Sequence, residues 1–153
     1  MKRLCLLLLA VAVAALAQDG KPNFSGTWEL QLDKSDFGPL PGPQSQTTMI
    51  EHKDPKLKIA VNAKTAQGEQ SSLRNLTTDG QENTNEVSGR TWKSKTRWEE
   101  KELLTETSFE VQGNKVQIKD RWKLSDDGKG MTIDRTLSSE MGEAAQKLVF
   151  AKK

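Results

Sequence analysis

The sequence predicts an all-β fold, an up-and-down antiparallel meander of about ten strands. Apolar and polar residues alternate in short stretches such as "KLKIAVNA", "TWKSKTRW" and "KVQIKDRWKL", which is typical of strands with one buried face. Pairs of turn-forming residues separate these stretches at regular intervals, among them Gln67-Gly68, Asp79-Gly80, Ser88-Gly89, Gly113-Asn114 and Asp127-Gly128. Only "SSEMGEAAQ" has the composition of a helical turn. Short strands at such regular spacing favour a β-sandwich or a β-barrel.

The beginning of the chain has the composition of a secretory signal peptide. Two basic residues precede an apolar run over residues 4–16, and the small residues of the "ALA" that ends at Ala17 form a cleavage site. The run is too short for a comfortable membrane span. We therefore expect residues 1–17 to be a signal peptide, cleaved after Ala17, and residues 18–153 to form one domain of a secreted or periplasmic protein.

Cysteine content and charge exclude several classes of function. The only cysteine, Cys5, lies in the leader, so the expected product has no disulfide, no thiol catalysis and no cysteine-based metal site. The formal net charge of +2 comes from Lys2 and Arg3, and without them acidic and basic residues are balanced. The charge therefore favours neither a nucleic acid nor an anionic membrane as a partner.

The turn signals divide the domain into its expected strands. These strands cover roughly residues 24–32, 46–53, 56–65, 70–78, 81–87, 90–98, 102–111, 115–124, 131–138 and 145–151. One long connection, "DKSDFGPLPGPQSQ", follows the first strand. Its prolines at 39, 41 and 43 forbid a helix. We expect it to cross one end of the structure as an extended flap.

The turns also predict which residues face each other across the strands. Folding the chain at Asp127-Gly128 places Asp120 opposite Arg135, on the face that carries the apolar residues. The same procedure at the other turns places Thr107 opposite Asp120 and Arg74 opposite Val61. The middle row of the inward face then ends in five polar residues: Asn83, Ser94, Thr107, Asp120 and Arg135. Because unpaired polar groups are costly in a dry core, this row predicts a partly hydrated cavity.

Two interpretations of the Asp120–Arg135 pair are open. It is a buried ion pair that fixes the register or closes the barrel wall, or it is a polar clamp for the headgroup of a ligand. Asp120 largely neutralises Arg135, so Arg135 alone is a poor receptor for an anion. Arg74 has no acidic residue opposite it and is the better candidate. Leu73 and Leu76 compete for the inward face of the same strand.

The chain has four tryptophans and no tyrosine. Trp28, Trp92 and Trp122 fall on the inward face, and Trp98 lies nearer a rim. Packing in the core explains them, and an aromatic lining for an apolar ligand is the alternative.

Catalysis finds little support in the sequence. His52 is the only histidine, and we find no Ser-His-Asp arrangement, no second metal ligand at a suitable spacing and no glycine-rich phosphate loop. An enzyme would need His52 near Asp120, and the register places them at opposite ends of the sheet. We expect no enzyme activity, no cofactor and no metal.

The stretch "NFSGTWEL" resembles the G-x-W signature of the calycin group, which comprises lipocalins and fatty-acid-binding proteins. Gly26 and Trp28 carry this structural signature. The resemblance implies a lipocalin-like barrel in which the tryptophan packs at one end, and lipocalins often cover it with an arginine from a late strand, here Arg135. The longer pattern "NFSGTW…DKSDFG…EHKDPKL…TTDG…IKDRW" is also similar to secreted acidobacterial proteins.

The chain departs from the fatty-acid-binding branch at two places. A Pro/Gly loop stands where that branch has a helical lid, so we expect no helical lid here. Arg135-Thr136-Leu137 stands where that branch has an Arg-x-Tyr pair that holds a carboxylate.

Our hypothesis from the sequence is a secreted or periplasmic non-catalytic binding protein. It would hold a small apolar or amphiphilic molecule in a mixed polar and aromatic barrel cavity, with no nucleic-acid partner and no membrane span. The candidate ligand-binding residues are Arg74, Asn83, Trp92, Ser94, Thr107, Asp120, Trp122 and Arg135. The alternative is a structural or protein-interaction module of the cell envelope with a self-filled core. A monomeric closed barrel and a curved open sheet that dimerises both satisfy the strand pairing.

Overall fold

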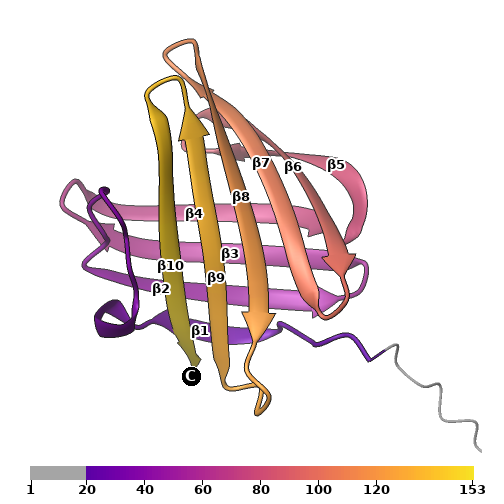
Figure 1. The fold of residues 1–153 in the computed structure, drawn as a ribbon. Helices are drawn as coiled ribbons and strands as arrows, with labels where there is room; N and C mark the ends of the chain where they lie inside the picture. The colour runs from indigo at the N-terminus through magenta and orange to yellow at the C-terminus, as the bar shows by residue number, and fades with distance from the viewer. Residues whose placement is uncertain (1–19) are drawn as a thin grey trace, which may run out of the picture.

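In the computed structural model, which describes residues 20–153, ten antiparallel strands form one sheet (Figure 1). The predicted signal peptide, residues 1–17, lies outside the described residues. The strands are β1 (Gly26–Leu30), β2 (Ser45–Lys53), β3 (Lys56–Thr65), β4 (Gly68–Thr77), β5 (Asp79–Val87), β6 (Arg90–Glu99), β7 (Glu102–Val111), β8 (Asn114–Leu124), β9 (Gly130–Ser139) and β10 (Gly142–Lys152). The all-β meander predicted from the sequence is thereby confirmed.

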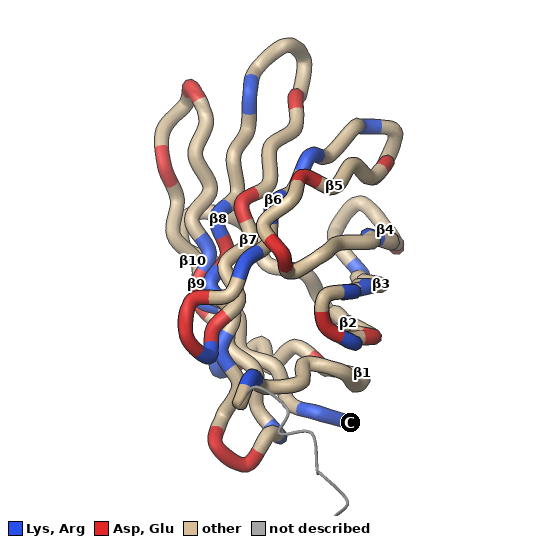
Figure 2. Tube along the Cα trace, turned by 90° about the vertical axis from the view of Figure 1, so that its right-hand side faces the viewer, with Lys and Arg blue, Asp and Glu red and all other residues tan. Residues whose placement is uncertain are grey.

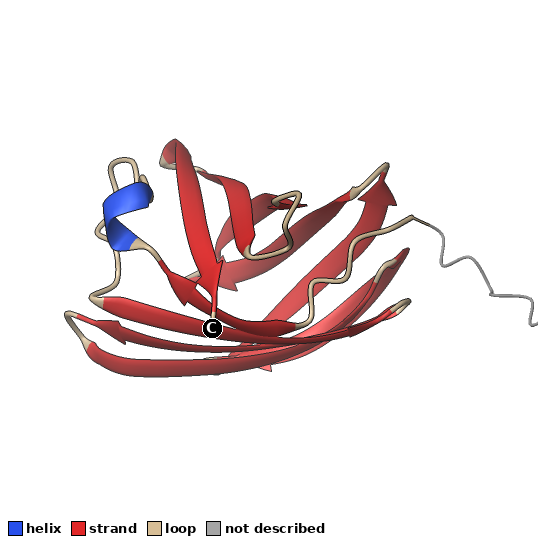
Figure 3. Cartoon of the chain, turned by 90° about the horizontal axis from the view of Figure 1, so that it is seen from below, coloured by secondary structure: helices blue, strands red, loops and turns tan. Residues whose placement is uncertain are grey.

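The sheet curls into a nearly closed barrel. Its strand order is β4-β3-β2-β1-β10-β9-β8-β7-β6-β5, so β1 joins the N-terminal strands to the C-terminal strands. In Figure 1, β1 to β4 cross behind β6 to β10, and Figure 3 shows the two groups as the opposing walls of one curved sheet. Among the described residues, no helix is long and apolar enough to cross a membrane.

The side-chain parity predicted from the turns is confirmed throughout the β6–β9 wall, but one register is wrong. Asp120 pairs with Arg135 and Ser94 with Thr107, as predicted. Between β7 and β8, however, Thr107 pairs with Ile118 and not with Asp120. The turn there is Gln112-Gly113, with φ of 51° and 82°, one residue earlier than the Gly113-Asn114 turn that was assumed. Moving a turn by one residue shifts the pairing by two, so the inward face is preserved.

The same two-residue shift occurs between β3 and β4. Arg74 pairs with Ile59 rather than with Val61, because the turn lies one residue earlier than assumed. The competition for the inward face is also resolved. Leu73 points outward and is 49% exposed, whereas Leu76 is buried in the core and Arg74 points inward.

The barrel has one seam, between β4 and β5, where consecutive strands do not form a backbone ladder. Asparagine side chains of β5 bond to the backbone of β4 instead. Asn85 accepts a hydrogen bond from the N–H of Asn75 at 2.8 Å and donates one to the carbonyl of Asn75 at 3.1 Å. Asn83 accepts from the N–H of Thr77 at 2.7 Å. These amides take the place of a neighbouring strand's backbone groups, because an amide side chain carries the same donor and acceptor as a peptide.

The barrel's own side chains fill one end of its interior. The buried apolar cluster there comprises Phe24, Trp28, Leu30, Ile50, Leu57, Ile59, Leu76, Leu103, Trp122, Met131, Ile133, Leu148 and Phe150. Trp28 donates from Nε1 to the carbonyl of Phe24 at 2.9 Å. The charged group over the Trp28 ring is Lys152, 5.4 Å from the ring centre, whereas Arg135 bonds to Asp120. The role for Arg135 that the lipocalin resemblance implied is therefore wrong.

The connection between β1 and β2 contains a three-residue 3-10 helix, Leu32–Lys34, and a turn at Gly38-Pro39. Asp36 bonds to Lys147 of β10 through both backbone groups at 2.8 Å, which fixes the path of the loop. No helical lid is present in this connection, as expected. "SSEMGEAAQ" forms strand ends and a tight turn, not a helical turn.

Candidate functional site

A cavity of about 520 Å³ lies inside the barrel, at the end opposite the filled core. The β3–β4 turn, the β5–β6 turn and the loop residues Pro41 and Pro43 surround its mouth. The flap expected from the proline-rich sequence thus reaches the open end of the barrel. Five of the candidate ligand-binding residues line the cavity: Arg74, Trp92, Thr107, Asp120 and Arg135.

The other three candidates lie elsewhere. Asn83 is part of the β4–β5 seam. Ser94 is buried in the wall, where its hydroxyl is 2.9 Å from that of Thr107. Trp122 belongs to the filled end and packs edge-on against Phe24, with 6.2 Å between the ring centres.

Asp120 and Arg135 form a bidentate ion pair on neighbouring strands. Nε and one terminal nitrogen of Arg135 donate to the two carboxylate oxygens of Asp120, each at 2.8 Å. Burial disfavours the charged form of Arg135, but the adjacent Asp120 carboxylate outweighs this effect and raises its pKa. Arg135 therefore stays protonated, and the carboxylate of Asp120 largely cancels its charge.

Arg74 is buried in the cavity wall without such a partner. Its relative exposure is 7%, and within residues 20–153 it makes no hydrogen bond and no ion pair. Burial lowers the pKa of Arg74 to about 10. The negative charge of Asp120 opposes this shift, and the positive charge of Arg135 adds to it. The guanidinium is therefore still positive at neutral pH. Its carbon lies 5.7 Å from the ring centre of Trp92, in cation–π geometry.

An aromatic pair forms the wall beside Arg74. The rings of Trp92 on β6 and Phe109 on β7 stack in parallel, 4.5 Å apart and 6° from coplanar. Nε1 of Trp92 is buried and has no hydrogen-bond partner. Phe109 was not among the sequence candidates, although the hairpin register placed it opposite Trp92. The cavity thus combines apolar surface with the unpaired guanidinium of Arg74, and apolar walls with a few polar groups are typical of a small-molecule site.

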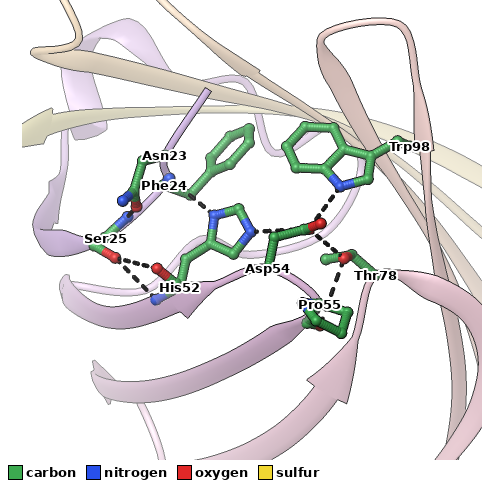
Figure 4. A network of polar contacts seen from close by, with 8 residues as sticks. All are labelled: Asn23, Phe24, Ser25, His52, Asp54, Pro55, Thr78 and Trp98. Atoms are coloured by element: carbon green, nitrogen blue, oxygen red, sulfur yellow. Dashed lines mark hydrogen bonds and ion pairs between the residues drawn. The ribbon is translucent and has the colours of Figure 1, made fainter. Parts of the chain in front are cut away.

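A separate polar network closes the filled end, as Figure 4 shows. Asp54 accepts hydrogen bonds from Nε1 of Trp98 at 2.8 Å and from the hydroxyl of Thr78, and Nε2 of His52 lies 3.5 Å from the same oxygen. Nδ1 of His52 accepts from the backbone N–H of Phe24 at 3.2 Å. The network connects the N-terminal segment and the β2–β3 turn to the β4–β5 connection and the end of β6.

The ionisation of this network follows from its contacts. Burial lowers the pKa of His52 despite the neighbouring carboxylate of Asp54. Burial opposes ionisation of Asp54, but hydrogen bonds from Thr78, Trp98 and His52 outweigh it and lower its pKa. His52 is therefore neutral, and it stabilises structure at the end of the barrel away from the Asp120 cavity. The sequence indicated only a turn at Asp54, because the partners of this residue come from distant segments.

Neither metal-binding chemistry nor a strongly charged face is found in the described part of the chain. Residues 20–153 contain no cluster of three or more side chains suited to hold a metal ion. Figure 2 shows acidic and basic positions interleaved along the strands and turns. On the outer face, Lys123 contacts Asp134 at 3.1 Å, and Arg121 pairs with Glu102.

Three solved structures show where this fold occurs. A secretory abundant heat soluble protein from Ramazzottius varieornatus matches with a TM-score of 0.65 and 16% identity over 84% of this chain and 94% of that chain. Zebrafish ileal bile acid-binding protein, complexed with cholic acid, matches with a TM-score of 0.59 and 14% identity, over 85% and 98%. Human cRBP IV matches with a TM-score of 0.57 and 15% identity, over 86% and 99%.

No family model matches the chain, and no curated protein matches it by sequence. The structural matches show that the fold is a calycin-like β-barrel, as the "NFSGTWEL" signature indicated. The similarity to acidobacterial proteins stays a prediction.

Proposed function

From this calycin-like barrel we propose a secreted or periplasmic, non-catalytic protein that binds a small amphiphilic molecule with an anionic group. The apolar part of the ligand lies against Trp92 and Phe109, and the anion lies at Arg74. The fold supports this proposal, since structural neighbours are described as a bile acid-binding protein and a fatty acid transporter. The leader sequence supports export.

The observation that carries the proposal is the buried, unpaired guanidinium of Arg74 at the cavity wall. A charge that is largely buried and lacks an ion-pair partner costs stability, and ionisable groups with perturbed pKa values are often found at functional sites. An anionic ligand in the cavity would supply the partner that the guanidinium of Arg74 lacks.

The neighbouring residues have supporting roles in this proposal. Thr107 lines the cavity, and its hydroxyl is bonded to that of Ser94 in the wall. Asp120 holds Arg135 in a fixed bidentate geometry, so this pair shapes the wall and supplies little net charge. Ser94 orients Thr107 from behind, Asn83 closes the seam, and Trp122 packs the filled end.

The alternative, an interaction module with a self-filled core, has one observation in its favour. Side chains do fill one end of the barrel. The cavity of about 520 Å³ at the other end argues against a core that is filled throughout. Binding measurements distinguish the two functions.

The test is calorimetric titration of the folded protein with octyl sulfate, which joins an apolar tail to a single negative charge. We expect saturable binding with one molecule per chain, weakened by about 10- to 100-fold in Arg74→Met because a charge-assisted hydrogen bond is lost. Arg97→Met is the matched control, since Arg97 is exposed on the outer face of β6. Wild-type protein that is folded but binds neither octyl sulfate nor octanoate would contradict the proposal.

A further inference from the structure

We infer that the cavity is selective for ligands with a single negative charge and that Asp120 sets this limit. The inference rests on the proposed function and specifies the ligand class of the same site. It comes from counting the charges that face the cavity and from the geometry that holds them.

Four charged residues line the cavity: Arg74, Arg90, Asp120 and Arg135. Arg90 is exposed at the mouth, at the start of β6, where water and salt screen its charge. The other three lie inside the barrel, and Asp120 is only 4% exposed. Because the bidentate contact with Asp120 neutralises Arg135, the interior carries one uncompensated positive charge, that of Arg74.

A ligand with one negative charge neutralises the net positive charge of this interior. The anion pairs with Arg74, and the cavity is then neutral. A second negative charge would have no partner inside the barrel, and the carboxylate of Asp120, which also lines the cavity, would repel it. An unpaired charge in such a space is expensive, so a doubly charged ligand should bind much more weakly.

The electrostatic coupling of the three groups supports this count. The charges of both Asp120 and Arg135 influence the ionisation of Arg74, so the three groups act on each other across the cavity. A change in the charge of Asp120 should therefore alter the field at the anion site, although β8 and β4 lie in opposite walls.

Octyl sulfate and octyl phosphate are the probes for the test. They share a tail and a tetrahedral headgroup, but at about pH 8 the phosphate carries nearly two charges, since its second pKa is about 6. We expect the wild-type protein to prefer the sulfate by at least about tenfold in titration calorimetry. Binding of both probes with equal affinity would overturn the inference.

Asp120→Asn tests the assigned role, because it leaves the interior with two positive charges and keeps the size of the side chain. The preference for octyl sulfate should fall by about tenfold or more. Asp134→Asn is the matched control. It removes the same charge from the outer face of β9, where Asp134 contacts Lys123, and should leave the preference unchanged.

A double variant keeps the test decisive if Asp120→Asn alone does not fold. Asp120→Asn with Arg135→Gln removes the whole ion pair and returns the interior to the single charge of Arg74. We expect this variant to prefer octyl sulfate as the wild type does. A preference clearly lower than that of the wild type would contradict the charge count. If the wild type binds octyl sulfate but shows none of these differences, only the inference fails, whereas absent binding of both probes contradicts the proposed function itself.

Discussion

In our account Arg74 destabilises the ligand-free protein and stabilises the complex with the proposed ligand. The side chain is buried, positive and without a hydrogen-bond partner in residues 20–153. We predict that Arg74→Met stabilises the ligand-free protein by about 1–3 kcal/mol, because it replaces an unpaired buried charge with an apolar side chain of similar length. Urea denaturation monitored by tryptophan fluorescence measures this change.

Arg97→Met provides the comparison for this stability measurement. Arg97 is exposed, so its replacement should change the free energy of unfolding by less than about 0.5 kcal/mol. If Arg74→Met instead destabilises the protein strongly, Arg74 is a structural residue and the anion site is wrongly assigned.

His52 makes the stability of the barrel depend on pH. Burial lowers its pKa in the folded state below the ordinary 6.5 that applies to the unfolded chain. Below pH 6.5 the unfolded chain therefore binds more protons than the folded one, and stability falls as the pH falls toward the lowered pKa. The lowered pKa of Asp54 has the same sign and acts below its ordinary 3.8.

Denaturation midpoints measured between about pH 7 and pH 5 test the role of His52. His52→Asn places an amide oxygen where Nδ1 accepts the N–H of Phe24, but it does not titrate. The loss of stability over this range should be smaller in the variant. An unchanged pH profile would show that another group is responsible.

At the level of strands, the sequence was sufficient for the side-chain parity but not for every register. Turn pairs such as Ser88-Gly89 and Asp127-Gly128 determined their hairpins correctly. At Gln112-Gly113 the glycine is the second turn residue, so Gln112 also adopts a positive φ. A glutamine in the sequence does not indicate such a conformation. Because the error moved the pairing by two residues, Arg74 and Asp120 were still placed on the inward face.

Neither the β4–β5 seam nor the Asp54 network could be predicted from the sequence, and the physical reason is the same for both. A turn pair such as Asp79-Gly80 between two strand patterns normally predicts that the two strands form a backbone ladder. Nothing in the local sequence indicates that Asn83 and Asn85 bond to the β4 backbone instead. The partners of Asp54 likewise come together only when the barrel curls. Such contacts depend on curvature, which an alternating pattern does not encode.

The seam makes its own prediction. We expect Asn83→Ala with Asn85→Ala to increase hydrogen exchange at the amides of Asn75 and Thr77, because both lose their acceptors. Stability should fall by about 1–3 kcal/mol, at roughly 0.5–1.5 kcal/mol for each hydrogen bond. Exchange measured by mass spectrometry on β4 peptides provides the readout.

Asn62→Ala is the control for the seam. Asn62 lies on β3 and bonds only to the side chain of Ser71 on the outer surface, so its loss should leave exchange in β4 unchanged. Protection at Asn75 and Thr77 that survives the double substitution would show that the asparagine side chains do not close the seam.

For the whole molecule, the division into a filled end and a hollow end explains how one small barrel can be both stable and able to bind. The apolar cluster and the Asp54 network stabilise one end without help from a ligand. The other end keeps its cavity and its unpaired Arg74. A ligand bound there would stabilise the barrel further, in proportion to the logarithm of its concentration.

Native mass spectrometry of the wild type and of Arg74→Met, both purified from the protein's own host, tests the central claim most directly. The account predicts a stoichiometric small molecule on the wild type, carrying one acidic group, and a bare folded chain for Arg74→Met. A bare wild-type chain that also fails to bind octyl sulfate, or the same bound molecule in equal amount on both proteins, would contradict it.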